Sequence, residues 1–147
     1  MTQYQHTQVG YAMILALVVA AVLIGMGSTF QPPPAQEISF AISILLLITI
    51  PIFYKLTITI DNKALRASFG VGIVRKRVSI GEIAGCEPIQ IRWWHGWGIH
   101  LTPYGWLYNV SGLDAVAIKL RSGRKLAFGT DDPQGLAAAI QRFKAAN

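Results

Sequence analysis

The sequence predicts a membrane-anchored α+β protein: a two-span transmembrane helical hairpin, then a small antiparallel β-sandwich or barrel that a C-terminal helix closes. The uneven distribution of charge is the first reason. Residues 1–54 contain no Lys or Arg and one acid, Glu37, whereas residues 55–147 hold all 13 basic residues and the other six acids. Long uncharged stretches fill the first part and short alternating stretches fill the second. The chain of 147 residues therefore divides at Lys55.

Two apolar stretches are long enough to cross a bilayer. Residues 9–30 are uncharged and would span ~33 Å as a helix, against a hydrocarbon core of ~30 Å. Residues 38–54 would span ~26 Å, near the short limit. The loop between them, residues 31–37, contains three consecutive prolines, which cannot continue a helix. A cleaved signal peptide is disfavoured because the chain lacks a basic start, and so short a chain cannot surround two such helices with protein.

Charge next to the spans predicts the orientation. Lys55, Lys63 and Arg66 follow the second span, while the loop 31–37 has no basic residue. Basic residues favour the cytoplasmic side, so we expect the domain 55–147 and the N-terminal tail 1–8 in the cytoplasm of an integral inner- or cell-membrane protein.

Small residues on the spans suggest how the helices pack. Ala12, Ala16 and Ala20 recur every four residues on the first span, and Ser39 and Ser43 do so on the second. Small side chains let helices approach closely in lipid. Packing within the hairpin explains the pattern, and contact with a second copy or another membrane protein through the same stripe is the alternative.

Alternation of apolar and polar residues predicts about seven short strands after Lys55. Pro88 is expected to break residues 81–91 into two short pieces. The segments expected to be extended are 56–61, 65–69, 73–80, 81–83, 89–91, 99–102, 106–110, 115–120 and 125–128. Such regular spacing is typical of a small sandwich or barrel.

The last element is predicted to be an amphipathic helix. Asp131 or Asp132 can cap it and Pro133 suits its first turn. Leu136 and Ile140 share one face with Phe143, so the helix is expected to cover an open end of the β domain.

Strands closed by one C-terminal helix resemble the pleckstrin-homology-like (PH-like) architecture. The stretches Trp97-Gly98-Ile99, 102–112 and 128–133 are similar to small bacterial membrane proteins that carry a PH-like domain after one or two spans. The resemblance covers roughly residues 55–145 and implies a fold and a membrane tether, but it supplies no catalytic residues. The first hairpin after the spans is a tight turn at Asn62-Lys63 rather than a long basic loop, which argues against inositol-phosphate recognition.

The sequence shows no pattern of catalytic, metal or cofactor chemistry. His95 and His100 are five residues apart, and their spacing to Cys86, the one cysteine, does not match a zinc site. No phosphate-binding loop or dinucleotide motif is present. We therefore expect a non-enzymatic protein without metal or cofactor, in which Cys86 is a small buried side chain.

The densest basic run is Arg75-Lys76-Arg77. On a strand, Arg75 and Arg77 share a face and Lys76 points away. These three residues, together with Lys63, are candidates for contact with anionic lipid headgroups. The alternative is a solvated strand edge that discourages pairing. Nucleic acid is not expected, because the chain lacks spaced aromatic and basic residues.

Residues 92–97 hold three of the four tryptophans. Trp93 and Trp94, flanked by Arg92 and His95, are candidates for contact with the membrane interface or with a partner. A self-packed loop over the core is the alternative. Trp97 and Trp106 are instead expected to belong to the domain, and Trp106→Ala is expected to cost about 3–5 kcal/mol as a buried aromatic does.

The sequence therefore predicts a membrane-anchored binding or scaffolding module whose partner it does not identify. Two other functions stay open: a peripheral sensor of anionic lipid headgroups, and an accessory subunit of a membrane enzyme or transporter.

Overall fold

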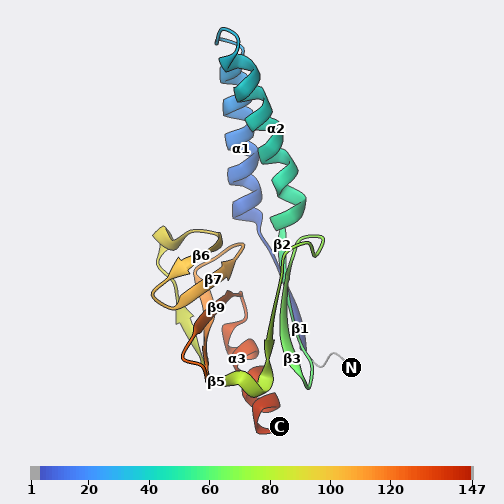
Figure 1. The fold of residues 1–147 in the computed structure, drawn as a ribbon, viewed down its shortest axis with the longest axis vertical. Coiled ribbons are helices and arrows are strands. Elements are labelled where there is room, and N and C mark those ends of the chain that lie inside the picture. Colours follow the sequence, from blue (N-terminus) through green and yellow to red (C-terminus); the bar gives the residue numbers. More distant parts are fainter. Residues whose placement is uncertain (1–3, 147) are drawn as a thin grey trace.

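The structure, a computed structural model, describes residues 4–146 as a pair of long helices above a β domain (Figure 1). The helices are α1 (Tyr11–Ser28), α2 (Ala35–Phe53) and α3 (Pro133–Ala145), with two single 3-10 turns, η1 (Ile80–Glu82) and η2 (Trp93–His95). The strands are β1 (Tyr4–Val9), β2 (Lys55–Ile60), β3 (Ala64–Phe69), β4 (Arg75–Ser79), β5 (Ile83–Gln90), β6 (Gly98–Thr102), β7 (Gly105–Asn109), β8 (Asp114–Leu120) and β9 (Lys125–Gly129).

Helices α1 and α2 are both long and apolar enough to span a membrane, which confirms the predicted pair of apolar helices. They pack along one seam, where Ser43 Oγ donates a hydrogen bond to the carbonyl oxygen of Ala21 at 2.6 Å. Most of the remaining apolar surface is bare, including that of Leu15, Leu23 and Leu45. The predicted small residue Ala16 also points outward rather than into this seam.

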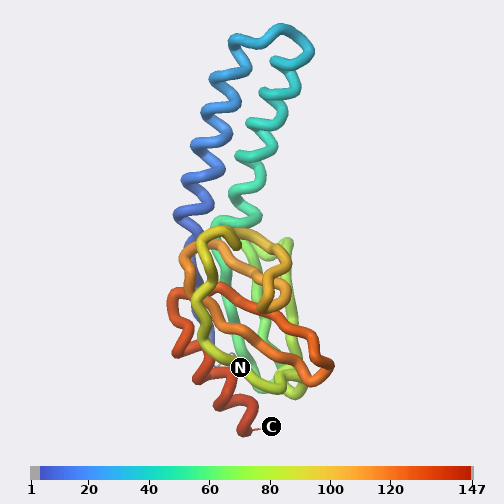
Figure 2. The backbone as a smooth tube through the Cα atoms, turned by 90° about the vertical axis from the view of Figure 1, so that its left-hand side faces the viewer, coloured from blue at the N-terminus to red at the C-terminus, as the bar shows by residue number. Residues whose placement is uncertain are grey.

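The helix pair is joined to the β domain without a linker. One residue, Gly10, separates β1 from α1, and one residue, Tyr54, separates α2 from β2. The Gly10 N–H donates to the Tyr54 carbonyl at 2.8 Å. At Gly70 the backbone lies so close to α2 that a Cβ atom would sit 2.2 Å from the Pro51 carbonyl oxygen. These backbone contacts fix the direction in which the hairpin leaves the domain (Figure 2).

The first sheet has the strand order β1-β2-β3-β4, and all its pairs are antiparallel. Leu56, Ile58 and Ile60 of β2 alternate with threonines, as the sequence predicts, and point into the core. Strand β1 covers residues 4–8 of the segment for which the sequence predicts only a tail, and it also includes Val9, the first residue of the predicted first span. The helical hairpin is therefore inserted between the first two strands of this sheet, rather than preceding the β domain as a separate unit.

The second sheet has the order β5-β8-β9-β7-β6, with β7 and β9 parallel. Its inner face carries Val116 and Ile118 of β8 beside Phe128 of β9, and these join the core cluster with residues of the first sheet. Its outer face carries a smaller cluster that includes Leu107 and Ala127.

Helix α3 covers one open corner of the two-sheet core. Its N-cap is Asp132, which accepts a hydrogen bond from the Gly135 N–H at 3.0 Å. Leu136, Ile140 and Phe143 are buried in the shared core, as the sequence predicts. The helix packs mainly on β5 and β8, and the Tyr4 hydroxyl of β1 donates to the Asp132 carboxylate at 3.3 Å.

Two expectations need correction. Pro88 does not break the chain into two pieces, because it lies within β5 opposite Val116. Strand β5 is at the edge of its sheet, where a residue without an N–H is tolerated if its nitrogen faces away from the neighbouring strand. The expectation of an all-antiparallel β domain is wrong as well, because β7 and β9 are parallel. Of the two predicted forms, sandwich or barrel, residues 4–146 form an open two-sheet sandwich.

Candidate functional site

The edge strand β4 presents basic side chains on both of its faces. Lys76 and Val78 pair with Ala67 and Leu65, which are buried in the core, so Lys76 points to the inner side of the sheet. Arg75 and Arg77 point to the outer, exposed side. The structure thus agrees with the predicted alternation along this run, but it separates Lys76 from the two arginines by the thickness of the sheet.

Opposite Lys76, the inner face of the second sheet is left uncovered. Trp106 pairs with Leu126 and Leu101 pairs with Trp106, so all three side chains lie on the inner side. The first sheet ends at β4 and does not extend over β7 and β6. Trp106 is consequently 49% exposed and Leu101 is 69% exposed. The expectation that Trp106 is a buried side chain is therefore wrong.

Between β4 and this uncovered face lies a cleft of about 430 Å³, which we call the edge cleft. Leu101, Trp106 and Tyr108 form its apolar floor. Tyr108 offers a neutral phenol hydroxyl group, and burial raises its pKa further above the ordinary value. The volume falls within the range of sites that bind small ligands or a few residues of a partner.

The edge cleft is strongly basic. Lys76, Arg124 and Lys125 line it, together with Arg77, whose side chain points to the outer side of β4. The one carboxylate among the described lining residues is that of Glu82. Neighbouring cations with low-dielectric walls focus a positive potential and attract anionic ligands. The arrangement of a basic rim over an apolar floor suits a ligand that is both acidic and partly apolar.

A second exposed feature lies at the helix-bearing end, the end of the β domain from which α1 and α2 emerge. The turn between β3 and β4 contains Val71 and Ile73, which are 63% and 69% exposed. The Val71 N–H donates to the carbonyl of Pro51 at the end of α2, at 3.3 Å. These two apolar side chains are therefore held beside the base of the hairpin.

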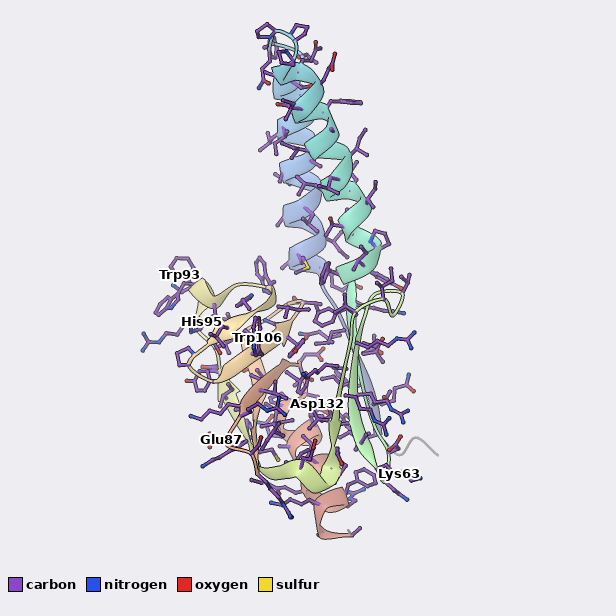
Figure 3. All side chains as sticks on the ribbon, viewed as in Figure 1. Lys63, Glu87, Trp93, His95, Trp106 and Asp132 are labelled. Atoms are coloured by element: carbon purple, nitrogen blue, oxygen red, sulfur yellow. The ribbon has the colours of Figure 1, made fainter. Side chains whose placement is uncertain are left out.

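The tryptophan loop, residues 92–97, lies at the same end, where Figure 3 labels Trp93 and His95. Trp93 is 76% exposed, and its ring meets the Trp94 ring edge-on at 5.9 Å between centroids. The Arg92 guanidinium lies over the Trp94 ring at 4.8 Å. The loop is thus a small exposed aromatic cluster and does not cover the core.

Lys63 is not near the other predicted lipid contacts. It lies in the β2–β3 turn at the far end of the domain (Figure 3), and its carbonyl accepts from the Ile80 N–H. Five residues of extended chain, roughly 17 Å, separate Arg75 from Ile80. Lys63 and Arg75 therefore lie at opposite ends of the β3–β4 strand pair.

Cys86 is half-buried, with its sulfur 3.7 Å from the Ala137 carbonyl oxygen. Burial raises the pKa of this thiol, which disfavours the reactive thiolate form. Among residues 4–146, no group of three or more His, Cys, Asp or Glu side chains is placed to hold a metal ion.

The floor of the edge cleft and the two basic residues Arg124 and Lys125 were not predicted from the sequence. The sequence signal that could have indicated the cleft is Lys76. It lies two residues before the apolar Val78, so both side chains are expected on the inner face of the strand. Comparison of the chain with models of known protein families and with curated proteins found no match.

Proposed function

We propose that the protein is a non-enzymatic, membrane-anchored binding module that holds its edge cleft at a fixed height and angle on the cytoplasmic surface of a membrane. The observation that carries this proposal is the linker-free junction between the hairpin and the first sheet, at Gly10 and Tyr54. A flexible tether would only keep the domain near the membrane. A junction of backbone hydrogen bonds also sets its orientation, which matters for a protein that presents a surface to a partner.

We further propose that the β domain is PH-like. Four strands, β1–β4, are followed by the antiparallel set β5, β8 and β9 and then by α3, which fits that architecture. In this interpretation, β6 and β7 are an inserted hairpin that provides the floor of the edge cleft. The connection between the first two strands would be the helical hairpin rather than a headgroup-binding loop.

The helix-bearing end supports a direct contact with the bilayer. The β3–β4 turn, which carries the exposed Val71 and Ile73, lies on one side of the hairpin base, and the tryptophan loop lies on the other (Figure 1). Exposed apolar and indole side chains at this level suit the membrane–water interface. Arg75 follows this turn directly and donates to the Gly72 carbonyl, and its position beside the exposed turn supports a contact with lipid headgroups.

Labelling from outside the cell tests the orientation. In a background where Cys86 is replaced by serine, Gln36→Cys near the hairpin tip should react with an impermeant maleimide in intact cells. Ser122→Cys, in the exposed β8–β9 turn, should react only after permeabilisation. The basis is the absence of Lys and Arg before Lys55. The opposite labelling pattern would reverse the proposed orientation.

Quenching by brominated lipid tests the interface contact. In proteoliposomes, Trp93→Phe or Trp94→Phe should remove a large share of the quenchable fluorescence, because the exposed tryptophan loop lies at the helix-bearing end. Trp106→Phe is the matched control and should leave the quenchable share unchanged, since Trp106 lines the edge cleft. Equal quenching of all three positions would contradict a contact limited to the helix-bearing end.

Lipid sensing is the second candidate function, favoured by the position of Arg75. Arg75→Gln should weaken the salt-sensitive part of the domain's attraction to anionic bilayers, whereas Lys63→Gln at the far end should not.

A further inference from the structure

We propose that the edge cleft binds an acidic, extended segment of a partner protein, which pairs with β4 as a fifth strand of the first sheet. This inference rests on the proposed function and names the class of partner for the same site. Three features of the structure carry it: the direction of the β4 backbone, the positions of the cations and the uncovered apolar floor.

The backbone of β4 has one side free for pairing. The hydrogen bonds from Phe69 N–H to the Val74 carbonyl and from Ile80 N–H to the Lys63 carbonyl fix the alternation of the β3–β4 ladder. In such a ladder every second residue bonds to the neighbouring strand and the others face away. The N–H and C=O groups of Arg75, Arg77 and Ser79 therefore face the open edge, and among residues 4–146 no strand pairs with that side.

The cations match the alternation of an added strand. A residue that pairs opposite Arg75 or Arg77 places its side chain on the outer face, and the next residue places its side chain on the inner face. Acidic side chains at the positions opposite Arg75 and Arg77 would therefore meet the two guanidinium groups on the outer face. A compact lipid headgroup cannot reach both faces of β4 at once, whereas an extended chain along the edge does so at every second residue.

The floor of the edge cleft indicates which side chains the added strand should carry at its inner positions. Leu101 and Trp106 are exposed on the inner side of the second sheet, directly across from Lys76. Apolar side chains of the partner segment, which we call the guest strand, would cover Leu101 and Trp106. They would close the open corner of the sandwich, much as α3 closes the other corner. The guest strand is thus expected to alternate acidic and apolar residues over about five positions, the length of β4.

A second copy of the chain does not fit the edge. Two β4 strands would bring Arg75, Lys76 and Arg77 of each copy together, and residues 55–147 carry 13 basic residues against six acids, a net charge of +7. Like charges opposite one another destabilise strand pairs. The same charges that prevent self-pairing favour an acidic strand.

The test uses the full chain in nanodiscs of neutral phosphatidylcholine and a labelled peptide, Glu-Val-Glu-Val-Glu-Val-Glu, followed by fluorescence anisotropy. We expect saturable binding that weakens with salt, and no binding of the corresponding Lys-Val peptide. Two further peptides carry N-methyl groups either on two central glutamates or on two central valines. The N–H groups of every second peptide residue face β4, so either the glutamate or the valine N–H groups donate to it. Methylation of the donating set should abolish binding, and methylation of the other set should leave binding unchanged.

Substitutions locate the binding surface. Arg77→Gln should weaken the peptide about two- to fivefold, as exposed ion pairs do, and Arg75→Gln with Arg77→Gln about tenfold. Trp106→Ala should weaken it tenfold or more, as for a central aromatic contact. Lys63→Gln is the charge-matched control at the far end and should leave affinity unchanged.

Equal loss from both methylated peptides, or equal binding of Glu-Glu-Glu-Glu-Val-Val-Val, would overturn strand pairing and leave only charge attraction. Displacement of the peptide by phosphatidylserine in the disc, at constant ionic strength, would assign the cations to lipid and also overturn it. Neither outcome affects the membrane-anchored orientation, which the labelling and quenching experiments test separately.

Discussion

Replacing Phe128 with alanine is expected to lower the free energy of unfolding of the β domain by about 3–5 kcal/mol. The Phe128 side chain is fully buried, and its ring stacks on Tyr108 with 5.3 Å between centroids. It belongs to the cluster that holds the two sheets and α3 together. The expected cost includes the cavity that the lost ring leaves as well as the lost apolar burial.

The matched comparison is Trp106→Ala, which removes a larger ring from the neighbouring strand β7. Because Trp106 is half-exposed above the edge cleft, its loss should cost under about 1 kcal/mol. Urea unfolding of both variants in detergent micelles, followed by circular dichroism of the β domain, measures the difference. Similar losses in the two variants would show that the open corner is closed in solution.

The N-terminal strand shows why part of the fold could not be predicted from sequence. Tyr4, His6 and Gln8 of β1 face the inner side of the sheet, where most strands carry aliphatic residues. Gln8 Nε2 donates to the Ser111 carbonyl at 3.0 Å, and His6 contacts Asp131. These partners lie more than 100 residues away in the chain, so a pattern that counts only apolar alternation does not find the strand.

Trp106 and Lys76 show a second limit of sequence patterns. The alternation of residues predicts which side chains share a face of a strand, and the strand register agrees with this for both residues. Whether an inner position is buried depends on how far the opposite sheet extends, and this sheet ends at β4. The edge cleft exists because of that missing cover, which no local pattern records.

Gly105→Ala is expected to destabilise the β domain by about 3 kcal/mol or more. Gly105 has a φ of +89°, and a Cβ atom there would lie 2.0 Å from the carbonyl oxygen of Lys125. The obstacle is the backbone of β9, which cannot rotate away as the end of a side chain can. Accommodating the methyl group requires β7 to separate from β9, and β7 carries the floor of the edge cleft.

Gly123→Ala isolates the steric part of this effect. Gly123 has a φ of +85°, close to that of Gly105, but a Cβ atom there would meet nothing within 4 Å, so only the backbone preference of about 1–2 kcal/mol is lost. Denaturant unfolding of the two variants in the same micelles gives the difference directly. If the parallel β7–β9 pair supports the cleft floor, Gly105→Ala should also abolish binding of the Glu-Val peptide while Gly123→Ala retains it. Equal unfolding free energies for the two variants would mean that β7 does not pack against Lys125 in solution, and the edge cleft would then lack its floor.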